Sequence, residues 1–128
     1  MPGQTVRVVT VDDHESFLRA AHDVIEATPD FEPVAEVSTI SEALRAVGEL
    51  EPELVLVDVY MPEMTGIELV RRIRERHGEV VAVLISSHDR SDIPNEVMGC
   101  GAVAFLPKQE LGPSTLRSLW AKHGTAAA

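Results

Sequence analysis

Five polar residues stand where apolar segments of the sequence end, and their types could do chemistry together. They are Asp12, Asp13, Asp58, Ser86 and Lys108. Three carboxylates gathered at one point would repel one another, and Lys108 supplies only one positive charge. A bound cation would relieve that repulsion. Oxygen ligands, with no His or Cys at ligand spacing, favour Mg²⁺ or Mn²⁺ as this cation.

These residue types suit phosphoryl transfer. That reaction needs an in-line nucleophile, a cation that bridges the transferring oxygens, and donors to the remaining phosphoryl oxygens. Asp58 can be the nucleophile, while Lys108 and the Ser86 hydroxyl can bind the phosphoryl oxygens. A carboxylate nucleophile gives a high-energy acyl phosphate, which suits a reversible signal. Taken singly, the two N-terminal aspartates could instead cap a helix, and the lysine could be a solvated surface residue.

The elements that must position these residues follow from the apolar pattern. Strand-like runs at residues 6–11, 34–37, 54–57, 80–85 and 102–106 alternate with helix-length amphipathic stretches. This alternation predicts an α/β fold, a doubly wound three-layer sandwich around a parallel sheet of five strands. Such flavodoxin-like (βα)5 folds commonly have the strand order 2-1-3-4-5. In that order the polar residues meet at one edge of the sheet.

Helix starts are marked by local signals between those runs. A Thr followed three residues later by Glu, the spacing of a capping box, occurs at 39–42 and again at 65–68. Pro113 predicts the start of the last helix. The helix expected before the last strand is the weakest, because Pro94 fits only a first turn and glycines near its end lower the helix propensity.

Length and composition fit one domain, expected over residues 1–123 with a frayed tail at 124–128. The apolar runs are far shorter than the roughly 20 residues needed to cross a bilayer. Cys100 is alone, so no internal disulfide can form, and we expect a cytoplasmic location. The net charge of −10 disfavours direct binding of nucleic acid or anionic membranes and favours a protein partner.

The segments that carry the polar residues resemble the receiver domains of response regulators. VVTVDDH resembles the first strand and acidic pair of that family, and LVLVDVYMPEMTG resembles its phosphoacceptor strand. VLISSHD resembles the fourth strand with its Ser or Thr, and GAVAFLPK resembles the fifth strand with its aromatic residue and lysine. The similarity covers nearly the whole chain, with the motifs in the family's order.

The resemblance implies a role for each site residue. Asp58 would accept a phosphoryl group from a histidine kinase or a histidine phosphotransfer protein. Ser86 and Lys108 would bind the transferred group. The metal, Mg²⁺ or Mn²⁺, would be held by Asp12, Asp13, Asp58 and the backbone carbonyl of Tyr60.

The resemblance also implies how the signal is passed on and ended. Ser86 and Phe105 would respond to phosphorylation, and the surface formed by the helix before the last strand, that strand and the last helix would rearrange. This surface would control an output protein or form a homodimer. Tyr60 and His88 would tune self-dephosphorylation. The chain would thus be a phosphoacceptor of a two-component phosphorelay, with no other enzyme activity.

Some positions depart from the common family pattern. Pro107 precedes Lys108 and Gln109 follows it, which resembles the branch often joined to helix-turn-helix output domains. Phe105 stands where tyrosine is commoner, and plain core packing is its alternative role. Two other functions are alternatives. An aspartate-nucleophile phosphatase would usually carry a second aspartate where this chain has Tyr60, and an unphosphorylated scaffold would not need the intact acids and lysine.

Overall fold

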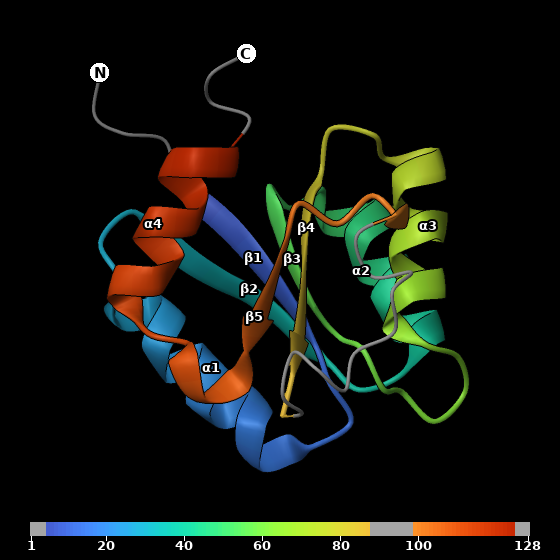
Figure 1. Ribbon diagram of the computed structural model, residues 1–128, viewed down its shortest axis with the longest axis horizontal. Coiled ribbons are helices and arrows are strands. Elements are labelled where there is room, and N and C mark those ends of the chain that lie inside the picture. Colours follow the sequence, from blue (N-terminus) through green and yellow to red (C-terminus); the bar gives the residue numbers. More distant parts are fainter. Residues whose placement is uncertain (1–4, 88–98, 125–128) are drawn as a thin grey trace.

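The computed structural model describes residues 5–87 and 99–124, which form one parallel sheet with helices on both faces (Figure 1). The strands are β1 Val6–Val11, β2 Phe31–Val37, β3 Leu54–Asp58, β4 Val81–Ser86 and β5 Ala104–Pro107. The helices are α1 Glu15–Ala27, α2 Ile40–Leu50, α3 Gly66–Arg76 and α4 Pro113–His123, and the short 3-10 helix η3 spans Lys108–Glu110.

The strands lie in the order β2-β1-β3-β4-β5 and all pair in parallel, which confirms the predicted topology. The last residue of β1 lies opposite Val57 in β3, and Asp58 lies opposite Ile85 in β4. Ser86, the last residue of β4, lies opposite Pro107 in β5. The carboxyl ends of these strands are therefore level, so the residues that end or follow them share one edge of the sheet.

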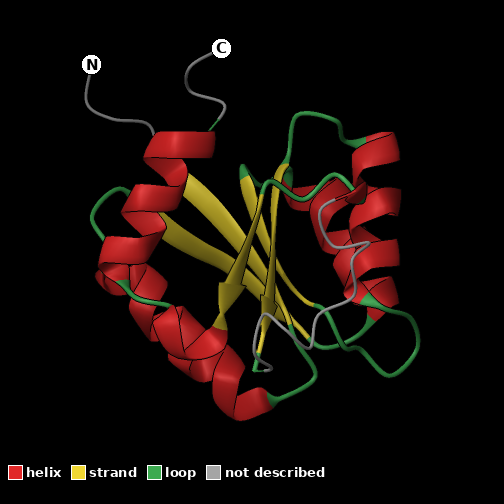
Figure 2. Cartoon of the chain, in the orientation of Figure 1, coloured by secondary structure: helices red, strands yellow, loops and turns green. Residues whose placement is uncertain are grey.

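Two helical layers enclose the sheet, α1 and α4 on one face and α2 and α3 on the other (Figure 2). Side chains alternate along β3. Leu54 and Leu56 join the core under α1 and α4, whereas Val55 and Val57 join the core under α2 and α3. The central strands β3 and β4 are buried along their whole length, which explains why both are rich in Val and Leu.

The predicted capping signals are confirmed at the starts of α2 and α3. Thr39 Oγ1 accepts a hydrogen bond from the Glu42 backbone N–H, and Thr65 Oγ1 accepts one from the Glu68 backbone N–H, each at 3.2 Å. Pro113 is the first residue of α4, as predicted. The Thr65 cap fixes the start of α3 only a short loop after the end of β3, and so helps to define the loop beside Asp58.

The bounds of some elements differ from those predicted. Strand β2 begins at Phe31 rather than at residue 34, because this edge strand is half-exposed and has no continuous apolar run. Strand β5 begins at Ala104 rather than at residue 102, after a turn in which Gly101 has a φ of 108°. The weak helix expected around Pro94 lies outside the described residues. Across the described ranges, no helix is long and apolar enough to cross a membrane.

Candidate functional site

The carboxyl ends of β1 and β3 bring together the three predicted acids and one histidine. Asp12, Asp13, His14 and Asp58 each offer a ligand atom, and these atoms all lie within 4.8 Å of one another. The Asp12 residue is 0% exposed and Asp58 is 3% exposed, whereas Asp13 and His14 are on the surface. The predicted convergence of the acids is therefore present, with two carboxylates buried and a third at the rim.

Lys108 reaches the same point from the end of β5. Its ammonium group lies 2.6 Å from Asp12 Oδ2 and 3.3 Å from Asp58 Oδ2. The contact with Asp58 is a hydrogen bond, and the group also lies 4.8 Å from the centroid of the Phe17 ring on α1. Pro107 ends β5 and Lys108 begins η3, so the lysine follows the last strand directly, at the same sheet edge as the acids.

The electrostatics of the site favour a further positive charge. Burial raises the pKa of the Asp58 carboxyl, and the Asp12 charge adds to the rise, while the Tyr60 N–H and the Lys108 ammonium oppose it. Asp12 Oδ2 is buried and accepts no hydrogen bond within the described residues, although Lys108 forms an ion pair with it. Hard oxygen donors that retain net negative charge fit a divalent cation such as Mg²⁺.

The loop after β3 holds the Asp58 carboxylate in place. The Tyr60 backbone N–H donates a hydrogen bond to Asp58 Oδ1 at 3.1 Å, and Tyr60 forms an isolated bridge with Thr65. The Gly66 N–H donates to the Val59 carbonyl at 2.7 Å. A Cβ on Gly66 would lie 2.1 Å from the Asp58 carbonyl oxygen, so the helix α3 can start this close only with glycine.

The remaining predicted residues lie around this centre to different extents. Ser86 is buried at the end of β4, next to the end of β3. Phe105 is half-buried and packs against the core under α2 and α3. The Tyr60 side chain is exposed, while its backbone adjoins Asp58. His88 lies outside the described residues.

Sequence reasoning missed His14 and Phe17. The expectation that no histidine stands at ligand spacing is wrong, because His14 Nδ1 lies 2.9 Å from Asp12 Oδ1 and 3.3 Å from Asp13 Oδ1. Its position directly after the acidic pair was the available signal. Phe17 lies in the first turn of α1, and its place beside Lys108 depends on side-chain packing that the apolar pattern does not specify.

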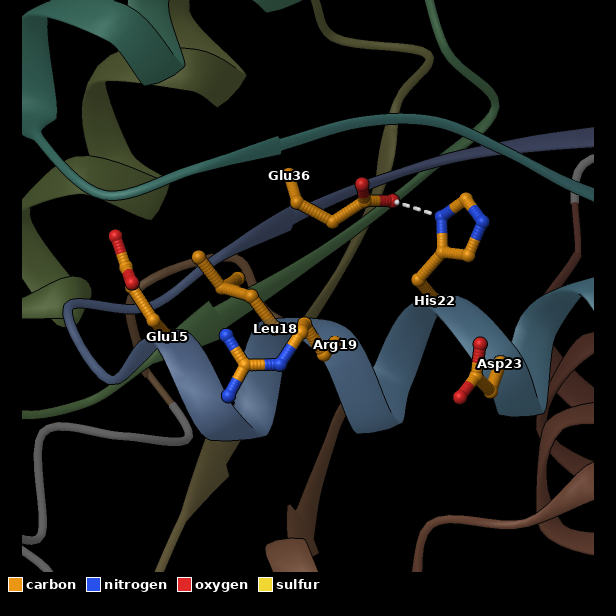
Figure 3. A pocket seen from close by; sticks show the side chains of 6 residues that line it. All are labelled: Glu15, Leu18, Arg19, His22, Asp23 and Glu36. Atoms are coloured by element: carbon orange, nitrogen blue, oxygen red, sulfur yellow. Dashed lines mark hydrogen bonds and ion pairs between the residues drawn. The ribbon is translucent and has the colours of Figure 1, made fainter.

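A hollow lies between α1 and the edge strand β2 (Figure 3). His22 Nδ1 lies 3.1 Å from Glu36 Oε2 across this hollow, and that hydrogen bond raises the pKa of the half-buried His22 imidazole. The predicted site residues do not line it; its lining residues are Glu15, Leu18, Arg19, His22, Asp23 and Glu36. The hollow is therefore distinct from the acidic site at the carboxyl edge of the sheet.

A model of the response regulator receiver domain family matches residues 8–119. This chain is a response regulator receiver domain. Response regulators are components of two-component systems. The aspartate cluster of this chain fits phosphorylation and Mg²⁺ binding.

Relatives of this receiver domain are longer proteins with varied outputs. It is 36% identical over 121 residues to a protein-glutamate methylesterase/protein-glutamine glutaminase of Nocardioides sp. (strain ATCC BAA-499 / JS614), which covers 93% of this chain and 32% of that protein. It is 33% identical over 103 residues to the transcriptional regulatory protein LiaR of Bacillus subtilis (strain 168), and the match covers 80% of this chain and 49% of LiaR. The chain thus spans between about a third and a half of these two curated relatives.

Solved structures of receiver domains share the fold along nearly the whole chain. The signal receiver domain of the response regulator NarL from Mycobacterium tuberculosis has a TM-score of 0.83 and 26% identity, covering 94% of this chain and 97% of that one. A two-component response regulator of the LuxR family from Aurantimonas sp. SI85-9A1 has a TM-score of 0.82 and 28% identity, covering 94% and 89%.

Proposed function

We propose that this receiver domain accepts a phosphoryl group on Asp58 from a phosphohistidine of a histidine kinase or a histidine phosphotransfer protein. The observation that carries the proposal is the position of the Asp58 carboxylate. It is buried at the end of β3, is oriented by the Tyr60 N–H, and contacts the Lys108 ammonium, which also contacts the Asp12 carboxylate. A buried nucleophile beside a second carboxylate and a positioned cation suits phosphoryl transfer.

In the proposed step, an Asp58 carboxylate oxygen attacks phosphorus in line with the leaving nitrogen. The bond from phosphorus to the donor imidazole breaks, and the imidazole nitrogen keeps the electron pair. Lys108 shifts from the carboxylates to a phosphoryl oxygen, and the Ser86 hydroxyl donates to another. Asp12, Asp13, Asp58 and the Tyr60 carbonyl would hold Mg²⁺ or Mn²⁺. The bound metal would neutralise negative charge on the phosphoryl oxygens.

Intact-mass measurement with a small-molecule phosphodonor tests this step. Incubation with acetyl phosphate and Mg²⁺ should add one phosphoryl group to the native protein and none to Asp58→Asn. Asp23→Asn, which removes an exposed carboxylate from α1, is the matched control and should be labelled like the native protein. Equal labelling of Asp58→Asn, or no labelling of the native protein, would contradict the proposal.

The proposed output surface comprises β5, α4 and the segment before β5 that includes the helix expected near Pro94. Phosphorylation adds roughly −1.5 to −2 charge next to Ser86 and Lys108, and these residues move to meet it. Lys108 directly follows β5, and Phe105 lies within that strand, so their movement would reach this surface. We propose that it controls an output protein or forms a homodimer. We expect phosphorylation to change amide exchange more in this output surface than in α2. Equal changes in the two regions would contradict the proposed output surface.

Tyr60 and His88 are proposed to set the lifetime of the phosphorylated state. The Tyr60 side chain is 39% exposed beside Asp58, where it can obstruct or order the water that attacks phosphorus. A several-fold change in the rate of phosphate loss is expected for Tyr60→Ala, on the scale of roughly 1 kcal/mol. Unchanged decay in Tyr60→Ala, His88→Ala and the double variant would exclude a role for both residues.

A further inference from the structure

The His14 imidazole is turned toward the acidic site rather than used in helix capping. His14 occupies the N-cap position of α1, yet its side chain makes no capping hydrogen bond. Its backbone N–H donates to Asp12 Oδ1 at 2.8 Å, and this bond folds the residue back over the acidic pair. The ring nitrogen Nδ1 consequently lies 2.9 Å from the same Asp12 oxygen. The histidine is thus fixed at the mouth of the site by its own backbone.

The spacing of these atoms matches that of neighbouring ligands around one metal ion. From His14 Nδ1, the distances are 2.9 Å to Asp12 Oδ1, 3.3 Å to Asp13 Oδ1 and 4.0 Å to Asp58 Oδ2. In an octahedral site with bonds of about 2.1 Å, adjacent ligand atoms lie about 3.0 Å apart and opposite ones about 4.2 Å apart. The ring can therefore join the carboxylates around a common cation with little movement.

We propose that His14 is a nitrogen ligand of this metal site and gives the site a preference for Co²⁺ and Ni²⁺ over Mg²⁺. The inference rests on the metal binding included in the proposed function. Carboxylates and water suit Mg²⁺, whereas imidazole suits the later transition metals, whose affinity for such ligands follows the order Mn²⁺ < Co²⁺ < Ni²⁺. Adding one nitrogen donor to a set of carboxylates therefore strengthens binding of the later metals more than binding of Mg²⁺.

A different role for the ring makes the opposite prediction for metal binding. If His14 served only as a positively charged partner of the acids, every dication would have to displace it. Removal of the ring would then strengthen the binding of Mg²⁺ and Co²⁺ alike. If the ring served only to support the loop, its removal would weaken both metals equally. Selectivity between the two metals therefore separates a ligand from either of these roles.

Another group of possible metal ligands, which contains His22, must be disrupted before the affinities are measured. His22, Asp23 and Glu26 on α1 also offer ligand atoms within 4.8 Å of one another, and such a cluster could take up Co²⁺ by itself. The test therefore compares His22→Ala with the double variant His14→Ala/His22→Ala. Both proteins are used without a histidine tag, so that no other introduced imidazole competes.

Isothermal titration with Co²⁺ and with Mg²⁺ gives the affinities. Loss of His14 should weaken Co²⁺ binding by at least about tenfold, since loss of a residue that merely supports a metal ligand already costs 10- to 100-fold. Binding of Mg²⁺ should change much less. Pulsed electron paramagnetic resonance of bound Mn²⁺ should show a coupled nitrogen nucleus in His22→Ala and none in the double variant. Equal weakening of both metals, strengthening of both, or a nitrogen coupling that survives His14→Ala would overturn the inference.

Phosphorylation of His22→Ala with acetyl phosphate and Mg²⁺ separates this inference from the proposed function. If His22→Ala is labelled on Asp58 and the loss of His14 leaves Co²⁺ affinity unchanged, only the role of His14 is wrong. If His22→Ala binds neither metal and is not labelled, the proposed metal-dependent function itself fails, and the inference fails with it.

Discussion

The Phe17 ring lies beneath the ammonium group of Lys108, with 4.8 Å between the nitrogen and the ring centroid. The same nitrogen contacts Asp12 and Asp58. The lysine is thus held by an aromatic face and two carboxylates, in the position from which it can meet a phosphoryl group.

Phe17→Leu should slow phosphorylation by acetyl phosphate about fivefold. Leucine keeps an apolar side chain in the core but lacks the ring quadrupole, whose attraction for an ammonium group is worth about 1 kcal/mol. Phe31→Leu is the matched control, because the Phe31 ring packs against Trp120 and not against the site residues. Intact-mass measurements over time give the labelling rate of each protein. Equal rates in the native protein and Phe17→Leu would show that the ring does not position the lysine.

Asp58→Asn should increase the free energy of unfolding at neutral pH in the presence of a chelator, by on the order of 1 kcal/mol. Burial and the Asp12 charge raise the pKa of Asp58 in the folded state above its ordinary value. Ionisation of a group with a raised folded-state pKa destabilises the fold, fully so at pH values above that pKa. Asparagine removes this ionisation and can still accept the Tyr60 hydrogen bond.

The gain from Asp58→Asn should shrink as the pH falls through the folded-state pKa of Asp58, and it should vanish near the ordinary aspartate value. Below that value, the carboxyl is protonated in both the folded and the unfolded chain. Urea unfolding at several pH values measures this dependence, with Glu32→Gln on the exposed part of β2 as a control. A gain that stays constant with pH would mean that ionisation of Asp58 is not its cause.

Gly66→Ala should destabilise the protein by about 3 kcal/mol and slow the phosphorylation of Asp58. The added methyl group would meet the Asp58 carbonyl oxygen at 2.1 Å and Val57 Cγ1 at 2.9 Å, so either α3 or the end of β3 must move. Gly48→Ala in α2 is the control, because its Cβ would meet nothing within 4 Å. That substitution should stabilise the helix by up to about 1 kcal/mol. Similar stability of the two variants would contradict the close approach of α3 to Asp58.

Much of the fold can be predicted from short segments of the sequence taken one at a time. The segments of β3 and β4 are continuously apolar because both faces of these strands are buried. Their positions can therefore be predicted from the apolar pattern alone. The predicted start of β2 is three residues late because Glu32 and Pro33 interrupt the apolar pattern of an edge strand. Thr39 and Thr65 predicted helix starts well, since a cap depends on neighbouring residues only.

The acidic site was predictable to the level of the sheet edge but not to the level of individual contacts. Parallel strands with level ends place Asp12, Asp58 and Lys108 at the same edge of the sheet. The orientation of the His14 ring and the contact of Lys108 with Phe17 depend on side-chain rotamers and on how α1 packs beside η3. Hydrophobic periodicity contains no information about such contacts.

Locating the phosphoryl group by reduction tests the central claim most directly. Borohydride converts an aspartyl phosphate into homoserine, and trypsin then releases residues 46–71, in which Asp58 is the single aspartate. Residues 8–19, released by the same digestion, contain Asp12 and Asp13. After labelling with acetyl phosphate and Mg²⁺, we predict homoserine at position 58 and unmodified aspartate in the 8–19 peptide. Homoserine at position 12 or 13, with Asp58 unchanged, would contradict the account.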